Sequence, residues 1–251
     1  MSARFASGKQ LGQLFYNDSE FDMTKVNFRP LDRGSDVRIS GRNLPHWFQA
    51  NAAVFVTFRS IDSMPADVVV LWQRELEHWL GTLRLPTELA ASVVMRRAEN
   101  HEALLETLDA KQQREFKRLS DRVFHRSLDE CYGACVLRQP PIAKIVGDAV
   151  RFFDGDKYDL DRFVVMPNHV HAIVQFRTGA TLSMISESWM RYTARLINKE
   201  IGATGPFWQP EPFDHVVRSA EQFSYLQTYI AENPKKANLK ANEALYWQRP
   251  E

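Results

Sequence analysis

Apolar positions along the chain follow two periods, one typical of strands and the other typical of helices. Short apolar runs predict strands at 52–60, 131–138, 158–166, 169–176 and 213–218. Apolar residues at every third or fourth position predict helices at 65–83, 142–153, 182–201 and 221–232. Strands separated by helices, with a tight hairpin at Pro167-Asn168, predict an α+β fold in which helices cover an antiparallel sheet.

Turn-forming residues indicate where several of these elements end. Asp154-Gly155-Asp156 predicts a turn before the strand 158–166, and Gly202 predicts the end of the helix 182–201. Asn233-Pro234 predicts the end of the last helix, because the residue before a proline disfavours helical geometry.

The rest of the chain is less regular. Residues 1–46 are polar and show no sustained period, which indicates an N-terminal extension. Residues 86–128 are highly charged and have a helical pattern without a strand signal. We expect residues 241–251 to be a C-terminal tail.

Composition is that of an ordinary soluble protein, with 44% hydrophobic and 25% charged residues in 251. A net charge of +1 gives no overall indication of nucleic-acid binding, so any basic surface must be local. No apolar stretch approaches the roughly 20 residues that cross a bilayer, and the N-terminus lacks the apolar core of a secretory signal. Cys131 and Cys135 suit a reducing cytoplasm, where we expect the protein to act. They could be half of a zinc site, but packing around a strand is the simpler account.

The main candidate for chemistry is a pair of histidines in the strand 169–176. Alternate side chains share a face of a strand, so His169 and His171 project together, roughly 6.5–7 Å apart, while Val170 faces the core. Two neutral imidazoles on one face can bind one divalent ion. The alternative is that both histidines merely line a half-buried strand.

The context of this pair resembles the HUH endonucleases and, more narrowly, the REP-associated tyrosine transposases. The resemblance rests on Met-Pro-Asn-His-Val-His at 166–171, followed by Tyr-Ile-Ala-Glu-Asn-Pro at 229–234. One departure is Met190, where the family pattern suggests lysine. Further blocks in the same order lie at 55–59, 132–137, 188–194, 207–209 and 213–218.

The resemblance implies a ferredoxin-like antiparallel sheet covered by helices, the HUH nuclease fold, in a catalytic domain at 47–240 with 86–128 as a helical insertion. It also implies a metal-dependent single-stranded DNA endonuclease and strand transferase that acts on hairpin, REP-type repeats through a 5′-phosphotyrosine. His169 and His171 would bind Mg²⁺ or Mn²⁺, and Tyr229 would be the nucleophile. Tyr225 is the rival tyrosine, which we expect to be a packing residue. The implied partner is single-stranded or hairpin DNA, bound by a monomer or a homodimer, with no membrane involved.

The resemblance further implies a third metal ligand on the tyrosine helix, one turn after the nucleophile. Asn233 fits this position, because residues four apart leave the same helix face. Its amide oxygen is a neutral, hard donor that suits Mg²⁺ or Mn²⁺. The alternative is that Asn233 only ends the helix.

Four other residues are candidates for the DNA path, each with a structural alternative. Trp208 could stack on a base or lie in the core. Arg218 could bind a phosphate or form an ion pair with Asp214, and His215 could be a general acid, a third ligand or a structural histidine. The candidates are Trp208, Gln209, His215 and Arg218.

A row of basic residues is a separate candidate for DNA binding. Its members are spaced to share one face of a predicted helix, and such a row could follow a nucleic-acid backbone or simply be a solvated face. The row comprises Lys111, Arg114, Arg118, Arg122 and Arg126.

Two other functions remain open. A non-catalytic protein that binds hairpin nucleic acid could retain the transposase fold. A metal phosphoesterase could use water in place of tyrosine and would form no covalent adduct.

Overall fold

The computed structural model describes the sheet, the helices that pack on it and parts of the remaining chain. Within 65–83 and 86–128, the described residues at 70, 74–75, 78–79, 81–82, 110–116 and 118 are helical, and those at 83 and 108–109 are not. The remaining residues of the two predicted helical segments lie outside the described residues. The described residues are 27–32, 38–41, 45–49, 51–64, 70, 74–75, 78–79, 81–83, 108–116, 118 and 130–250.

A five-stranded sheet forms the centre of the molecule, with strand order β6-β3-β5-β4-β7 and antiparallel pairing throughout. The strands are β3 (Ala53–Arg59), β4 (Tyr158–Val165), β5 (His169–Phe176), β6 (Phe213–Val216) and β7 (Leu245–Gln248). A separate two-stranded sheet pairs β1 (Arg38–Gly41) with β2 (Pro45–Phe48).

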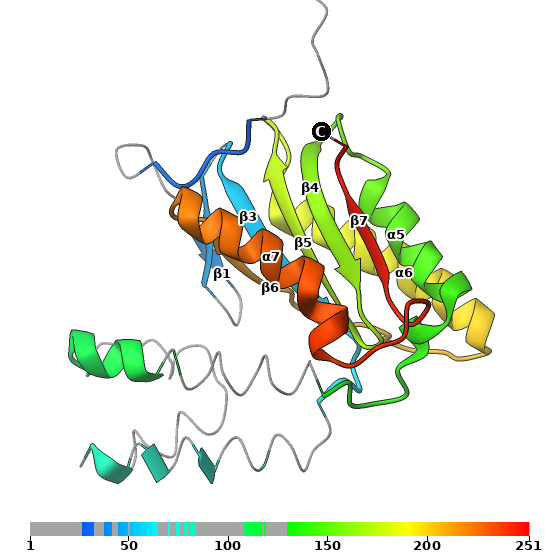
Figure 1. The fold of residues 1–251 in the computed structure, drawn as a ribbon, viewed down its shortest axis with the longest axis horizontal. Coiled ribbons are helices and arrows are strands. Elements are labelled where there is room, and N and C mark those ends of the chain that lie inside the picture. Colours follow the sequence, from blue (N-terminus) through cyan, green and yellow to red (C-terminus); the bar gives the residue numbers. More distant parts are fainter. Residues whose placement is uncertain are drawn as a thin grey trace, which may run out of the picture.

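Helices cover both faces of the main sheet (Figure 1). The helices α5 (Pro140–Arg151) and α6 (Leu182–Ile201) lie on one face, and α7 (Ala220–Lys236) lies on the other. The described elements from β3 to β6 follow the order β-α-β-β-α-β, which with this strand order is the ferredoxin-like arrangement. The predicted α+β fold, a ferredoxin-like antiparallel sheet covered by helices, is therefore confirmed.

Alternation along the strands divides the core into two layers. On β3, Val54, Val56 and Phe58 pack in the layer of α5 and α6, whereas Ala53 and Phe55 pack in the layer that contains α7 residues. Every residue of β5 is buried, because β5 lies between β3 and β4 and has helices on both faces.

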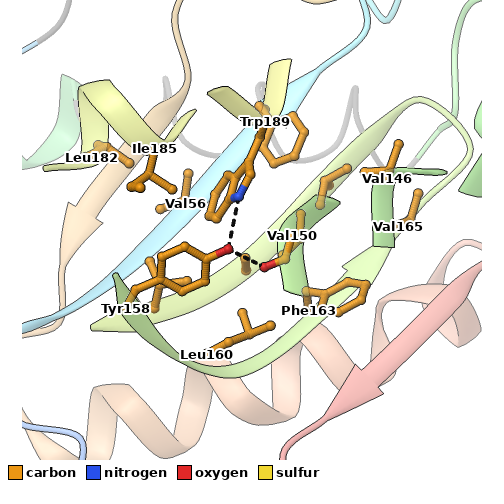
Figure 2. Close-up of a cluster of buried hydrophobic side chains, with 14 of the residues drawn as sticks. Val56, Val146, Val150, Tyr158, Leu160, Phe163, Val165, Leu182, Ile185 and Trp189 are labelled. Atoms are coloured by element: carbon orange, nitrogen blue, oxygen red, sulfur yellow. Dashed lines mark hydrogen bonds between the residues drawn. The ribbon is translucent and has the colours of Figure 1, made fainter. Parts of the chain in front are cut away.

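One buried polar group joins three elements of the first layer (Figure 2). The Tyr158 hydroxyl of β4 donates to the Val150 carbonyl of α5 at 2.6 Å and accepts from Trp189 Nε1 of α6 at 3.1 Å. Burial raises the pKa of Tyr158 to about 12. The hydroxyl is thus held in its neutral form, with both hydrogen bonds made.

Most predicted elements begin and end within about two residues of their predicted bounds. Thr181 caps α6 by accepting from the Met184 amide, and Gly202, at φ 66°, ends it as expected. The hairpin between β4 and β5 closes with the Met166 amide donating to the His169 carbonyl at 2.8 Å.

The predicted strand at 131–138 is wrong. This segment is a turn followed by the short 3-10 helix η1 (Val136–Arg138). Cys131, Gly133 and Cys135 have φ values of 52°, 94° and 51°, which a strand cannot accommodate. The Leu137 amide instead donates to the Pro167 carbonyl at 3.2 Å, so the segment packs against the turn of the β4-β5 hairpin.

The predicted end of the last helix at Asn233-Pro234 is also wrong, because α7 continues to Lys236 with Pro234 inside it. Asn233 and Ile230 are both fully buried, and this packing outweighs the local preference of a residue before proline. The helix ends with the Ala237 amide donating to the Asn233 carbonyl at 3.1 Å.

The segment expected to be a C-terminal tail contains β7, which pairs with the outer edge of β4. Trp247 stacks on Phe163 with ring centroids 5.8 Å apart, and the Arg249 guanidinium forms an ion pair with Asp154. Residues after 240 therefore complete the sheet on this side.

Candidate metal and nucleophile site

The two candidate histidines lie together at the beginning of β5, on the face covered by α7. Both side chains are 0% exposed, and their ring centroids are 4.6 Å apart. The ring of Phe55, which packs in the α7 layer, stacks on His171 at 5.2 Å. Val170 packs in the opposite layer, as the alternation predicted.

Tyr229 reaches this pair from α7. Its hydroxyl oxygen lies 3.5 Å from Nε2 of His171, at the outer limit of a hydrogen bond. The Tyr229 ring also packs edge-on against Phe55 at 6.1 Å, and the Lys236 ammonium lies 5.1 Å from its centroid. The half-buried phenol is therefore held beside the histidines by packing on both sides.

Tyr225 lies one turn earlier on α7 and differs from the expectation of a packing residue. Its side chain is 65% exposed, although residues four apart lie on the same face of a helix. Its ring is nearly parallel to that of Tyr229, with centroids 6.4 Å apart. Of these two tyrosines, Tyr229 is the one whose hydroxyl lies beside the histidine pair.

Asn233 lies one turn after Tyr229 and is 0% exposed. Within the part of the chain that the structure describes, neither its amide nitrogen nor its amide oxygen has a hydrogen-bond partner. An unsatisfied buried amide typically costs about 1–3 kcal/mol, so this group needs an explanation. The helix-stop alternative does not supply one, because α7 continues past Asn233.

These residues form a donor set suited to a divalent ion. Among the described residues, no cluster of three His, Cys, Asp or Glu side chains could hold a metal. Two imidazoles and a neutral amide oxygen are nevertheless donors that a divalent ion accepts. A bound ion would also give the buried Asn233 oxygen its missing partner, so the residues present fit the metal.

Each histidine has a partner on its other ring nitrogen. Thr57 Oγ1 lies 2.7 Å from Nδ1 of His171, and Asn168 Oδ1 lies 2.7 Å from Nδ1 of His169. Such partners orient imidazoles that bind metals. Sequence reasoning missed both roles. The sequence indicates only a turn at Asn168, and Thr57 lies opposite His171 only because of the β3-β5 register.

The family model for IS200-like transposases matches residues 143–233. Over this segment the chain is similar to that family. No curated protein sequence matches the chain. Among solved structures, a REP-associated tyrosine transposase bound to a REP hairpin is similar, with 14% sequence identity and a TM-score of 0.39 over 76% of this chain and 71% of that chain. The family resemblance predicted from the sequence is confirmed.

The IS200-like segment contains His169, His171, Tyr229 and Asn233, whereas Thr57 lies before it. Met190, at the position where lysine was expected, is partly buried and packs against the hydrophobic core of the first layer. None of the helices in the described residues is both long and apolar enough to span a membrane.

Trp208 of this transposase-like chain lies in the core, contrary to its suggested role in stacking on a base. Its side chain is 5% exposed and packs edge-on against Phe58 at 4.9 Å. Its Nε1 donates to Thr193 Oγ1 at 2.8 Å. Stacking on a base would require the indole to leave these contacts, so the core alternative describes Trp208.

The other three candidates for the DNA path lie at the surface or partly buried. The side-chain nitrogen of Gln209 donates a hydrogen bond to the Ile61 carbonyl at 2.8 Å. This bond ties Gln209 to the chain just after β3. His215 packs on the far side of Phe55 from His171 and lies 3.4 Å from Gln222 Nε2. The Phe55 ring therefore separates His215 from the histidine pair. Arg218 is exposed near the beginning of α7.

The basic row is described only in part. Lys111, Arg114 and Arg118 are exposed, and Lys111 and Arg114 lie in a helical segment. Arg122 and Arg126 lie outside the described residues. Exposure agrees with both DNA contact and a solvated face, so DNA contact by this row stays a prediction.

Proposed function

We propose that this chain is a metal-dependent single-stranded DNA endonuclease and strand transferase that acts on hairpin-forming, REP-type repeats through a 5′-phosphotyrosine. The observation that carries the proposal is the position of Tyr229. Its hydroxyl lies 3.5 Å from Nε2 of His171, 58 residues away in the sequence, and the His171 ring packs against that of the buried His169. One helical turn after Tyr229, the buried Asn233 amide has no hydrogen-bond partner among the described residues. The match of residues 143–233 to the family model for IS200-like transposases supports the same chemistry.

His169, His171 and Asn233 would hold one Mg²⁺ or Mn²⁺ ion. When bound, such an ion polarises a phosphate and neutralises the charge that develops during phosphoryl transfer. The protein contributes a site whose donors are already buried and oriented, because the Nδ1 atoms of both histidines are engaged by Asn168 and Thr57.

Tyr229 carries out the covalent step. Its hydroxyl oxygen forms a bond to the phosphorus of the scissile phosphate, and the bond from phosphorus to the 3′-oxygen breaks. The phenolic proton passes to solvent, and the departing 3′-oxygen takes up a proton to become a hydroxyl. The product is a 5′-phosphotyrosine, and the 3′-hydroxyl of a second strand can attack it in the reverse sense. Because one phosphodiester replaces another, rejoining needs no nucleotide cofactor.

Positively charged groups at both ends of α7 suit a polyanionic substrate. The Lys236 ammonium lies over the Tyr229 ring, and Arg218 is exposed at the other end of the same helix. Contacts to phosphate supply most of the affinity of nucleic-acid binding proteins. We therefore assign the DNA path to the exposed side of α7, with the basic row as a second contact.

The test of this proposal is Tyr229→Phe, which removes only the attacking oxygen. Incubation with hairpin DNA should give the unmodified protein a covalent adduct on a denaturing gel. The variant should give none, while it binds the hairpin within about twofold of the unmodified protein because its phosphate contacts remain. Tyr225→Phe is the matched control, since it removes the same group one turn away and should retain the adduct.

Two results would contradict the proposal. Cleavage by Tyr229→Phe without any adduct would favour a phosphoesterase that uses water. Hairpin binding by the unmodified protein without cleavage, in the presence of Mn²⁺, would favour a non-catalytic nucleic-acid binding protein.

A further inference from the structure

The turn residue Asn168 has a defined amide orientation. It is 0% exposed, and its Nδ2 donates to the Tyr132 carbonyl at 2.9 Å. A carbonyl only accepts hydrogen bonds, so the nitrogen of the amide must face Tyr132. The oxygen Oδ1 is therefore the atom that lies 2.7 Å from Nδ1 of His169.

This orientation determines the form of the imidazole. An amide oxygen has no proton to give, so Nδ1 of His169 must carry the proton of the hydrogen bond. In a neutral imidazole the lone pair is then on Nε2. We propose that Asn168 is a positioning residue that holds His169 in the Nδ1–H tautomer and so presents Nε2 as a metal ligand. This inference rests on the proposed function for its use of a metal.

The second histidine is held differently. Its Nδ1 partner is the hydroxyl of Thr57, which can either donate or accept. Thr57 therefore orients the His171 ring without dictating which nitrogen carries the proton. The two imidazoles differ in this respect, because the partner at Nδ1 of His169 can only accept, whereas the partner at Nδ1 of His171 can do either.

The fold holds Asn168 from three sides. The Asn168 carbonyl accepts from the Ser60 amide at 2.8 Å, and the neighbouring Pro167 carbonyl accepts from the Leu137 amide at 3.2 Å. The turn that carries the Tyr132 carbonyl is fixed in turn by Asp62, which accepts from the Ala134 amide at 2.7 Å.

Gly133 allows this close approach. It has a φ of 94°, and a Cβ atom there would lie 2.7 Å from the Asp62 carbonyl oxygen. The segment 131–138, expected to be a strand, thus serves as the support for the Asn168 amide.

The experiment measures the tautomer directly. Full-length protein is labelled with ¹⁵N-histidine, freed of metal and studied at alkaline pH by long-range ¹H–¹⁵N correlation spectra, in which protonated and unprotonated ring nitrogens differ. The chain has seven histidines, and the signals that disappear in His169→Ala identify His169. We expect the Nδ1–H tautomer in the unmodified protein and a mixture of tautomers in Asn168→Ala.

Two matched variants and a metal titration complete the design. Asn168→Asp keeps an accepting oxygen near Nδ1 and should keep the Nδ1–H tautomer. Thr57→Val removes the partner of the other histidine and should leave the His169 tautomer unchanged. The Kd for Mn²⁺, measured from the signal of free Mn²⁺ by electron paramagnetic resonance, should rise about 10- to 100-fold in Asn168→Ala and less in Asn168→Asp.

An Nε2–H tautomer of His169 in the unmodified protein would overturn the inference, and so would an unchanged tautomer in Asn168→Ala. A protein with the expected tautomers that binds no Mn²⁺ would support the role of Asn168 in setting the tautomer. That outcome would contradict the proposed function instead, so the two failures are distinguishable.

Discussion

At the scale of single residues, the site consists of buried polar side chains that make only some of their possible hydrogen bonds with the protein. His169, His171 and Asn233 are all 0% exposed, and both histidines have an Nδ1 partner. Asn233 has none among the described residues. A buried amide without a partner lowers stability, and proteins retain such groups mainly where a ligand completes them. Asn233 is therefore the residue whose removal best separates metal binding from folding.

Asn233→Ala should raise the Mn²⁺ concentration needed for half-maximal cleavage by about tenfold. The free energy of unfolding should stay within about 1 kcal/mol of that of the unmodified protein or increase. This is expected because the variant removes an unsatisfied group and because alanine favours a helix. Cleavage assays at several Mn²⁺ concentrations and urea unfolding measure the two effects.

Thr193→Ala is the control for this prediction. Thr193 is equally buried, but its hydroxyl accepts from Trp208 and donates to the Trp189 carbonyl. Its removal should cost about 1–3 kcal/mol of stability and leave the Mn²⁺ requirement unchanged. A large loss of stability in Asn233→Ala, with unaltered metal dependence, would show that Asn233 is a purely structural residue.

At the scale of elements, the site lies between the central strand β5 and the helix α7. A strand buried on both faces has little freedom to shift, so it holds the two histidines in a fixed register. Tyr225, Tyr229 and Asn233 follow one another at intervals of four residues on the same helix face, and Tyr225 is 65% exposed whereas Asn233 is 0% exposed. Helical spacing puts both tyrosines on one face, so it is the position along the helix that brings the Tyr229 hydroxyl, 3.5 Å from Nε2 of His171, to the histidine pair.

A further prediction at this scale concerns the helix that carries the basic row. Replacing Arg114, Arg118 and Arg122 with alanine should weaken hairpin binding and flatten its dependence on salt. For each phosphate that the variant no longer binds, the slope of log K against log salt concentration should fall by about 0.7–0.9. Binding titrations at several salt concentrations measure the slope. An unchanged slope would mean that the row is a solvated face.

At the scale of the whole molecule, the proposed ligands come from elements far apart in the chain and belong to the folded state only. The unfolded chain does not hold two histidines of β5 beside an asparagine of α7. A metal that binds only the folded protein stabilises it by mass action. Metal binding should therefore be visible in the unfolding of the whole protein, independently of any cleavage.

Mn²⁺ at a free concentration 100 times its Kd should increase the free energy of unfolding by about 2.7 kcal/mol. Thermal unfolding with Mn²⁺ should show the corresponding rise in Tm, and excess EDTA should reverse it. His169→Ala should remove most of this shift because it removes a ligand. A shift of equal size in that variant would place the metal elsewhere in the protein.

The sequence by itself determined most of the described elements from β3 to α7 and their order, but not η1 or β7. Alternation in 169–176 was enough to put His169 and His171 on one face and Val170 on the other, because side-chain direction in a strand follows from backbone geometry. Spacing along α7 likewise put Asn233 on the inner face together with Tyr229. The family motifs led to the expected chemistry and to the ferredoxin-like sheet. Both expectations were made without knowing which residues are in contact.

Tertiary structure alone decided which partners these residues meet. Asn233-Pro234 has the local preference of a helix end, yet burial of Asn233 in the α7 layer keeps it inside the helix. Trp208 was equally compatible with a surface and a core position until its contacts with Phe58 and Thr193 fixed it. Such contacts join residues distant in sequence, and their free energies exceed the small local preferences on which sequence patterns rest.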